Sequence, residues 1–500
     1  MSDENVFQRK CCGDGVSIEE LERRIDERLE ADWPAFLDDL RSLIQIESIE
    51  DLTQAKPGAP FGPGPERALD RISEIMRERL GDGKSIDGYV ACADIPGISG
   101  RQVGIIGHVD VVPAGPGWHF PPYDLTLRDG YLIGRGTSDD KGPLLAALWA
   151  ASFWVGAAGK ADDDEAVVLP LRHSIRVIAG ANEETNMADV AYYQRHFPDP
   201  DFLFTPDAEF PLGYGEAGLF QGTLKSAPIN GGLIVEISGG AATNAVPGEA
   251  YAVVRLADGA GVDEPGGMPQ PTDKVSVLGL GDGLVRIEAR GKSAHASTPE
   301  LGESAIFLLA GYLLDNGLCS ASERPFMQLL RKALAETDGS GAGIQATDED
   351  FGSLTCVGGV IGMRDGCITQ SVDCRYPANT SGDAIAAKLS ALAETIGASF
   401  KVDIDKPPFL MNPEGAAVKA LMTAYNRVTG KQAAPFTMKG GTYARKFAHA
   451  VSFGPEELDE RRPDWVGTMH GPDEGISEPS LKRAAKIYAL AIGLLMRVDL

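Results

Sequence analysis

The chain is poor in the residues that mark several classes of protein. Its seven cysteines are scattered over 500 residues, without the paired spacings of a disulfide framework or a zinc finger, so we expect neither. Lysine and arginine together number 46 against 72 aspartates and glutamates, which gives a net charge of −26. Nucleic acids and anionic membranes attract clustered positive charge, so we expect no binding to either.

Long apolar runs are also scarce. The start of the chain, MSDENVFQRKCCGDG, is polar and charged. It lacks the apolar core of a secretory signal, so we expect a cytoplasmic protein with a flexible tail over residues 1–16. The longest mostly apolar stretch, 142–159, approaches the length of a membrane span. Because it directly follows the charged sequence DDK and is rich in alanine and glycine, we favour a buried core helix.

The chain is too long for one ordinary core, so two domains are expected. Up to about residue 215, strands that end in polar loops alternate with helices. This pattern predicts an α/β domain with a mixed, mainly parallel sheet flanked by helices. Short alternating strands over 216–404 predict an inserted α+β domain, so residues 17–215 and 405–500 would form one discontinuous domain.

Helical periodicity and helix-end signals predict the main helices. Ser17 and Glu20 form a capping box in front of a periodic apolar run. The predicted helices cover about 17–46, 66–80, 143–157, 302–315, 325–337, 413–429 and 478–497.

Five residues of the types that bind metals lie beside turn residues, each in its own string. His108 lies in GHVDVVP, Asp139 in GRGTSDDKGP, Glu184 in ANEET, Asp207 in TPDAEFP and His470 in MHGPDEG. Two histidines and three carboxylates suit a site for two divalent ions of the zinc type.

Each string alone also has a plainer interpretation. His108 could belong to a polar turn, Asp139 to a helix N-terminus, and Glu183 with Glu184 to a solvated acidic turn. Asp110 lies two residues after His108 and, on an extended segment, points the same way. It therefore suits a carboxylate that orients a metal-bound histidine. We favour the metal interpretation because the five strings independently suit one site.

These strings also resemble a known family. With NAVPGEA, GKSAHAS, VDCRYP and GGTYAR, they run from about residue 104 onward in the order typical of the dinuclear-zinc exopeptidases. That superfamily includes aminoacylase, carboxypeptidase G2-type enzymes and carnosinase-like dipeptidases, and PDAEFP, GGTYAR and CRYP resemble its PepV-type bacterial dipeptidases. The resemblance implies a metal-dependent dipeptidase that hydrolyses unblocked dipeptides. It also implies two divalent metal ions, zinc first and manganese or cobalt as alternatives.

The resemblance implies a role for each residue of the metal site. The ligands would form two overlapping sets, one of His108, Asp139 and Asp207 and the other of Asp139, Glu184 and His470. Asp110 would orient His108. Glu183 would be the general base that takes a proton from the metal-bridging water and passes it to the leaving amine.

The inserted domain would act as a lid. The resemblance implies that His295 in GKSAHAS donates to the oxyanion and that Asn244 and Arg375 bind the substrate. Arg375 or Arg445 would pair with the C-terminal carboxylate of the dipeptide. Without the resemblance, His295 would be interpreted as a loop histidine and Arg375 as part of a surface ion pair.

The remaining expectations concern the backbone near the substrate, the partners and the rival functions. Gly440 and Gly441 would let the backbone approach the substrate closely. The expected partner is a small peptide substrate, and the long insertion favours a monomer. An N-acyl-amino-acid deacylase or desuccinylase of the same superfamily remains open, because its metal site would be the same. An inactive binding scaffold would lack a ligand or Glu183, and all are present.

Overall fold

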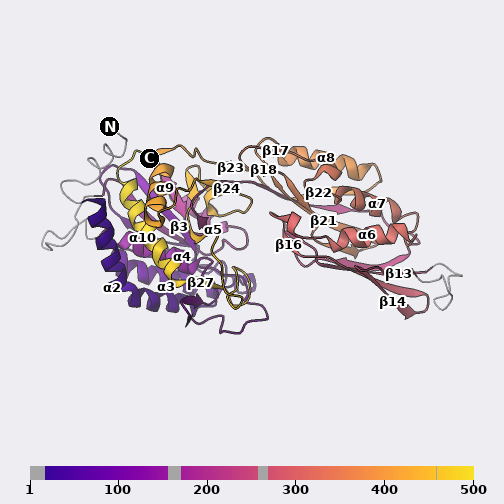
Figure 1. Ribbon diagram of the computed structural model, residues 1–500, viewed down its shortest axis with the longest axis horizontal. Helices are drawn as coiled ribbons and strands as arrows, with labels where there is room; N and C mark the ends of the chain where they lie inside the picture. Colours follow the sequence, from indigo (N-terminus) through magenta and orange to yellow (C-terminus); the bar gives the residue numbers. More distant parts are fainter. Residues whose placement is uncertain (1–16, 156–170, 257–268, 458) are drawn as a thin grey trace. The chain divides into compact units, whose positions relative to one another are not determined.

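The computed structural model describes residues 17–155, 171–256, 269–457 and 459–500, and the chain divides into two compact units (Figure 1). The first unit comprises Met1–Gly215, Leu410–Phe436 and Gly441–Leu500, and the second comprises Glu216–Phe409 and Thr437–Gly440. The predicted tail over 1–16 lies outside the described residues.

The second unit extends beyond the predicted end at residue 404, which falls inside a strand, Ser399–Lys406. It also takes in the short segment Thr437–Gly440. Long-range hydrogen bonds tie that segment to the second unit, since the Thr437 hydroxyl donates to the Asp350 carbonyl and Lys439 Nζ donates to the Ser353 carbonyl at 2.9 Å. Contacts of this kind leave no local signal in the sequence.

A mixed sheet forms the centre of the first unit. Its strands are β1 (Lys84–Ile86), β2 (Val90–Ile95), β3 (Gln102–His108), β6 (Ser174–Gly180), β7 (Phe202–Thr205), β9 (Gly213–Glu216), β23 (Phe409–Leu410), β24 (Phe436–Met438) and β25 (Ala450–Ser452). They are ordered β1-β2-β6-β3-β7-β25-β9-β23, with β24 also paired to β9. The four strands β6, β3, β7 and β25 are parallel, whereas β2 pairs with β6, and β9 with β25, in antiparallel fashion. The predicted α/β class is confirmed, with the parallel pairing in the middle of the sheet.

Six α-helices flank this sheet within the described part of the first unit. They are α2 (Ile18–Ile44), α3 (Pro63–Leu80), α4 (Lys141–Ser152), α5 (Ala188–His196), α9 (Ala416–Thr429) and α10 (Glu478–Leu495), joined by the short helices η2 (Leu52–Gln54) and η6 (Tyr443–Lys446). The Ser17 side chain accepts a hydrogen bond from the Glu20 N–H at 3.2 Å and so caps α2 as predicted. The Glu20 carboxylate instead accepts from Arg23 and Arg24. Helix α5 was not predicted, because it is short and its N-cap residue, Met187, offers no capping side chain; the Ala188 N–H donates instead to the side chains of Asn182 and Asn186.

Helix α4 accounts for the longest apolar run. Every one of its residues is buried, and it packs against α10, α2 and β3 in the core of the first unit. It ends at Ser152, earlier than predicted, and residues 156–159 of the run lie outside the described part. Across the described residues, no helix combines the length and apolar character needed to cross a membrane.

Two small sheets complete the first unit. One has the strands β4 (Thr126–Arg128), β5 (Tyr131–Ile133) and β27 (Gly475–Ser477), and the other has β8 (Ala208–Phe210) and β26 (Pro455–Glu457). Pairing of β27 with β5 places the segment before Gly475 beside the segment after Ile133.

The second unit is built on an antiparallel sheet with its own apolar core. Its strands are β10 (Gly218–Lys225), β11 (Ile234–Gly239), β13 (Glu249–Arg255), β14 (Val275–Gly281), β15 (Leu284–Arg290), β19 (Thr355–Val357), β20 (Ile361–Arg364), β21 (Cys367–Tyr376) and β22 (Ser399–Lys406). Two-stranded ribbons are formed by β12 (Ala245–Val246) with β16 (Ala294–His295), and by β17 (Thr347–Asp348) with β18 (Gly352–Ser353). The strand order is β14-β15-β13-β11-β20-β21-β10-β22, with β19 beside β21.

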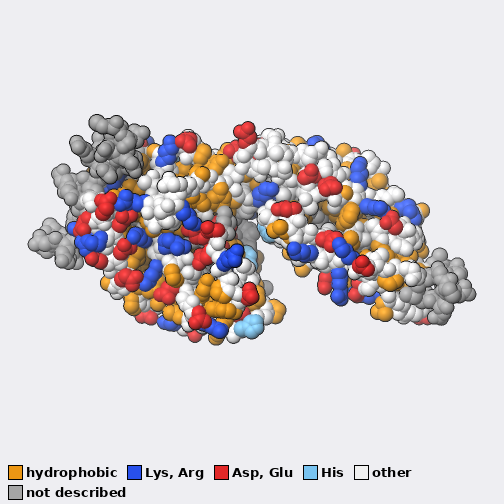
Figure 2. All heavy atoms as spheres, in the orientation of Figure 1, with side chains coloured by type: hydrophobic (Ala, Val, Ile, Leu, Met, Phe, Trp, Pro, Cys, Tyr) orange, Lys and Arg blue, Asp and Glu red, His pale blue; other side chains and the backbone are white. Residues whose placement is uncertain are grey.

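The helices of the second unit pack on this sheet, as the α+β prediction requires. They are α6 (Ala305–Asp315), α7 (Arg324–Ala333) and α8 (Gly382–Glu394), with the short helices η4 (Pro299–Leu301) and η5 (Ser340–Ala342). Helix α6 packs on β13 and β15, and α8, which was not predicted, packs on β10 and β22. Figure 2 shows acidic and basic side chains interleaved over the visible face of each unit.

Candidate functional site

Three of the predicted metal ligands lie just after neighbouring parallel strands. His108 is the last residue of β3, Glu184 follows β6, and Asp207 follows β7. Strand β3 pairs in parallel with both β6 and β7, so the carboxyl ends of the three strands meet at one edge of the sheet. The fold therefore brings together residues that are up to 99 positions apart, from 108 to 207.

The first group consists of His108, Asp139 and Asp207. The Nε2 atom of His108 lies 3.0 Å from Asp139 Oδ1 and 3.6 Å from Asp207 Oδ2. The His108 side chain is fully buried, and those of Asp139 and Asp207 are 9% and 17% exposed. These three residues can each offer one ligand atom to a single metal ion.

The second group consists of Asp139, Glu184 and His470. The Nε2 atom of His470 lies 2.9 Å from Asp139 Oδ2 and 3.1 Å from Glu184 Oε2. Asp139 therefore uses one carboxylate oxygen toward each histidine and belongs to both groups. A carboxylate with this arrangement can bridge two cations.

The buried carboxylates of the two groups need a nearby positive charge to be stable as anions. Burial, and then repulsion from Asp139, raises the pKa of Asp207 to about 8 and also raises the pKa of Glu184. Hydrogen bonds to Asp139 and Glu184 raise the pKa of His470 to about 11. Buried carboxylates this close together are stable as anions only beside a positive charge, which a divalent cation supplies. The donor set of imidazole nitrogen and carboxylate oxygen fits zinc, manganese or cobalt.

Glu183 and Asp110 lie beside these groups. Burial, and then the charge of Asp207, raises the pKa of Glu183 well above its usual range. The Asp110 carboxylate accepts hydrogen bonds from the backbone N–H groups of Glu183 and Glu184, both at 3.2 Å. The Nδ1 atom of His108 lies 3.0 Å from the Asp110 carbonyl oxygen and 3.5 Å from its carboxylate. The atom of Asp110 nearest the ring is therefore its carbonyl oxygen rather than the carboxylate oxygen that the sequence suggested.

Three of the predicted substrate residues lie in the second unit. His295 is the last residue of β16, Asn244 directly precedes β12, and the Asn244 carbonyl accepts a hydrogen bond from the Ala296 N–H at 2.9 Å. The Ala296 carbonyl in turn accepts from the Thr355 hydroxyl at 2.8 Å, and Thr355 is the strand partner of Arg375. This chain of contacts links the three residues within one unit.

The side chains of this group differ in exposure. The His295 ring is exposed, and its Nδ1 lies 2.7 Å from the Ser297 hydroxyl. The Arg375 side chain is buried; its Nε donates to Asp373 Oδ1 at 3.0 Å and its Nη1 donates to the Lys439 carbonyl at 3.1 Å. Arg375 is therefore not the surface ion pair that its sequence context alone suggested.

The other predicted substrate residues lie at the junction between the units along the chain. Gly440 is the last residue of the second unit, and Gly441 opens the final segment of the first. Arg445 lies in η6, and a Cβ atom on Gly441 would contact its guanidinium at 3.4 Å. That distance is an ordinary van der Waals contact, so the position of the Arg445 head group does not itself require glycine at 441.

Sequence reasoning missed a buried pair next to the turn that carries Glu183 and Glu184. The Asp189 carboxylate accepts from the backbone N–H groups of Ala181 and Asn182, at 2.7 and 2.8 Å, and from the Tyr443 hydroxyl. The ring of Tyr443, from the string GGTYAR, lies edge-on to His108 with centroids 6.3 Å apart. Burial raises the pKa of Asp189 to about 6. Tyr443 stood in a string that carried the resemblance, but its partner is 254 positions away.

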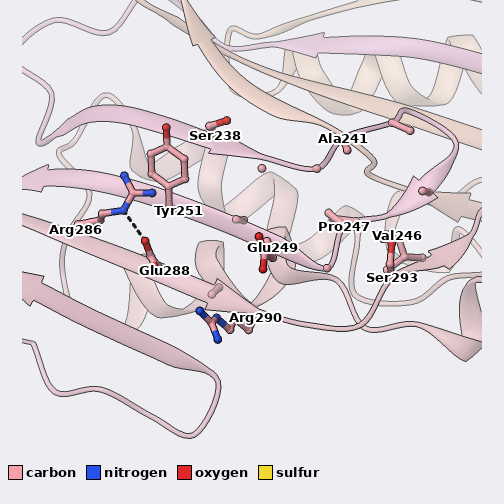
Figure 3. A pocket seen from close by; sticks show the side chains of 17 residues that line it. Ser238, Ala241, Val246, Pro247, Glu249, Tyr251, Arg286, Glu288, Arg290 and Ser293 are labelled. Carbon is pink, nitrogen blue, oxygen red and sulfur yellow. Dashed lines mark hydrogen bonds and ion pairs between the residues drawn. The ribbon is translucent and has the colours of Figure 1, made fainter. Parts of the chain in front are cut away.

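A hollow on the second unit borders the ribbon that carries His295, since Ala245 and Val246 of β12 and the nearby Ser293 line it. It has a volume of about 530 Å³ and is lined by β11, β13, β15 and the loop between β11 and β13 (Figure 3). Its lining includes Tyr251, Arg286 and Glu288, and Arg286 donates to Glu288 at 2.6 Å (Figure 3). Neither Asn244, His295 nor Arg375 lines it.

Comparison with known proteins identifies the family of the chain. Residues 104–493 match the family described as peptidase family M20/M25/M40. The putative dipeptidase YtjP of Bacillus subtilis is 30% identical over 463 residues, which are 91% of this chain and 96% of that protein. The Beta-Ala-Xaa dipeptidase of Lactobacillus delbrueckii subsp. lactis is 30% identical over 485 residues, 94% of this chain and 98% of that protein.

A solved structure extends the likeness to the fold. The crystal structure of human carnosine dipeptidase 1 aligns with 96% of this chain and 99% of its own, with a TM-score of 0.53 at 17% identity. At this identity the likeness concerns the fold alone.

Proposed function

The chain belongs to the M20/M25/M40 peptidase family, as its motifs predicted, and is a peptide-bond hydrolase, and from this premise we propose that it is a dipeptidase that cleaves unblocked dipeptides with two divalent metal ions. One observation carries the proposal: the two oxygens of Asp139 lie 3.0 and 2.9 Å from the Nε2 atoms of two histidines on different segments. Relatives at about 30% identity that are named as dipeptidases support the substrate class.

The proposed ligands are the members of the two groups. His108, Asp139 and Asp207 would hold one ion, and Asp139, Glu184 and His470 the other, with zinc as the first candidate. When bound, the ions would polarise the scissile carbonyl and lower the pKa of the attacking water. The backbone under Glu184 is fixed by the Asp110 carboxylate, so one ligand is held in place before any ion arrives.

Glu183 is the proposed general base. Its carboxylate takes a proton from the attacking water, whose oxygen forms the new bond to the carbonyl carbon. As the carbon–nitrogen bond breaks, the same carboxyl group returns the proton to the leaving amine, so that the products are two amino acids. Burial raises the pKa of this carboxyl group, and its anion is therefore a stronger base than an exposed carboxylate.

Residues of the second unit, together with Arg445 of the first, supply substrate contacts in this proposal. His295 donates to the developing oxyanion, Asn244 binds the substrate backbone, and Arg375 or Arg445 pairs with its C-terminal carboxylate. The ring of His295 is exposed, which supports this role, and the contact of its Nδ1 with the Ser297 hydroxyl at 2.7 Å orients the ring. We also propose that the protein is a monomer, which light scattering coupled to size exclusion would test.

The test is a panel of substrates given to chelated protein to which Zn²⁺ or Mn²⁺ is restored. The panel contains free dipeptides, the same dipeptides acetylated at the N-terminus, and N-acyl amino acids, and released amine is measured. Cleavage restricted to the free dipeptides is the expected result. Preference for the acylated compounds would replace the proposal with a deacylase, and no cleavage at all would favour an inactive scaffold.

A further inference from the structure

A buried ion pair lies next to the two groups of candidate metal ligands and belongs to neither. Arg135 and Glu474 are 1% and 0% exposed, and Arg135 Nη1 donates to Glu474 Oε2. Arg135 follows β5, and Glu474 directly precedes β27, the antiparallel partner of β5. Strand pairing therefore brings together two charged residues that are 339 positions apart.

The Glu474 carboxylate fixes the backbone that carries Asp139. Its Oε1 atom accepts hydrogen bonds from the N–H groups of Gly136 and Ser138, both at 3.0 Å, and from the N–H of Asp139 at 3.2 Å. Three donors converge on one oxygen, while the other oxygen is held by Arg135. The position of Asp139, which both metal groups share, thus depends on a carboxylate that is not itself a candidate ligand.

Arg135 reaches the segment that carries His470. Its Nη2 atom donates to the carbonyl oxygens of His470 and Gly471, at 3.2 and 3.3 Å. The guanidinium also lies over the Trp118 ring, 5.3 Å from its centroid. His470 has a φ of +63°, a conformation that residues other than glycine rarely adopt and that persists only when the surroundings hold it.

We infer that the Arg135–Glu474 pair is a positioning unit that locks the Asp139 and His470 segments together and thereby builds the second metal group. The inference rests on the proposed function, since it takes these residues to be ligands. Both side chains are buried and neither is a candidate ligand, so Glu474 acts through the backbone of Asp139 and Arg135 through the backbone of His470. A buried ion pair is weak evidence for stability alone, because desolvation of the two charges offsets their attraction.

Two variants separate this role from a general effect on folding. Arg135→Lys keeps a cation for Glu474 but loses the planar second nitrogen that reaches His470 and Gly471. Glu474→Gln keeps the shape and an oxygen for the three N–H donors but removes the charge that pairs with Arg135. The control is Asp39→Asn, because Asp39 is also a buried carboxylate between two arginines, Arg71 at 3.1 Å and Arg79 at 2.9 Å, on helices that carry no candidate ligand.

The readout is Zn²⁺ affinity, measured by competition with a chelator on folded protein, with circular dichroism to verify the fold. We expect two ions per chain in the wild type and in Asp39→Asn. In Arg135→Lys and Glu474→Gln, the affinity for one of the two ions should fall about 10- to 100-fold, the usual effect of removing a residue that holds a metal ligand in place. A folded variant with both affinities unchanged would overturn the inference, as would an equal loss in Asp39→Asn. A wild type that binds fewer than two ions would instead contradict the proposed function, and the inference with it.

Discussion

The two units bring their functional residues together in different ways. In the first, β3, β6 and β7 run parallel, so the residues that follow them gather at one edge of the sheet. In the second, the paired strands run antiparallel, and neighbouring strands end at opposite edges. Its candidate residues come instead from inside a strand, as with Arg375 in β21, or from a ribbon, as with His295. Within the described residues, the groups able to hold a metal all lie in the first unit. Parallel topology thus suits a cluster of like charges, and antiparallel topology suits separate contacts to a substrate.

The strongest test of this contrast removes the carboxylate that both groups share. Asp139→Ala should lose both metal ions and at least about a thousand-fold in kcat, because the ions supply several kcal/mol of transition-state stabilisation. The control is Asp201→Ala, which removes a carboxylate at the opposite end of β7, where Asp201 pairs with Arg101. Metal analysis and kcat measured on both variants check this prediction. Metal loss in Asp201→Ala would show that metal binding does not depend on a carboxylate at the carboxyl end of the strand.

The second prediction separates proton transfer from metal binding. Glu183→Ala should still bind two ions but lose at least several hundred-fold in kcat, the usual size of a general-base contribution. The measurement is kcat at saturating dipeptide with metal content determined on the same sample. Unchanged turnover would remove Glu183 from the mechanism.

A third prediction concerns the two arginines that compete for one role. The two variants are Arg375→Lys and Arg445→Lys. The one that replaces the arginine bound to the C-terminal carboxylate of the substrate should lower kcat/KM about 10- to 100-fold, because lysine cannot form the bidentate contact. The loss should shrink for a dipeptide whose C-terminus is amidated, since that substrate lacks the carboxylate. If both variants treat free and amidated dipeptides alike, neither arginine binds that carboxylate.

The smallest predicted effect is the change in folding stability with pH, which differs between the two units. In the metal-free first unit, burial raises the pKa of Asp207 to about 8, of Glu474 to about 7 and of Asp189 to about 6. The folded state therefore binds more protons than the unfolded state between about pH 4 and these values, and stability falls as pH rises from 5 to 7. In the second unit, the pKa values of Asp338 and Asp403 are lowered, so these groups stay ionised throughout that window.

Hydrogen exchange of chelated protein at pH 5 and 7, corrected for intrinsic rates, measures this difference. Protection should fall at pH 7 in β3, β6 and β7 and stay constant in β10 and β21, and added zinc should restore it. Equal loss of protection in both units would show that the buried acids of the first unit are not the cause.

Much of the site could be predicted because each ligand lies in a string with its own local signal. His108, for instance, ends an apolar strand, and His470 lies in a loop marked by glycine and proline. The residues that support the ligands could not be predicted, because their partners are far away in the sequence. Glu474 is hydrogen-bonded to Arg135, 339 positions away, and Asp189 to Tyr443, 254 positions away.

In the fold, as in the site, the features that could be predicted are those with a local signal in the sequence. The long amphipathic helices and the change of pattern near residue 216 are local features, and both units reflect them. The N-cap residue of helix α5 is a methionine, which offers no capping side chain, and the helix has only nine residues, so its local signal is weak. The return of Thr437–Gly440 to the second unit depends on hydrogen bonds to β18 and its neighbours, which become visible only in the folded chain.

Anomalous scattering from crystals of the zinc-loaded protein, recorded at the zinc edge, tests most directly whether two metal ions share Asp139. We expect two peaks on either side of Asp139, one beside His108 and Asp207 and the other beside Glu184 and His470. A single peak, or peaks that do not flank Asp139, would contradict that expectation.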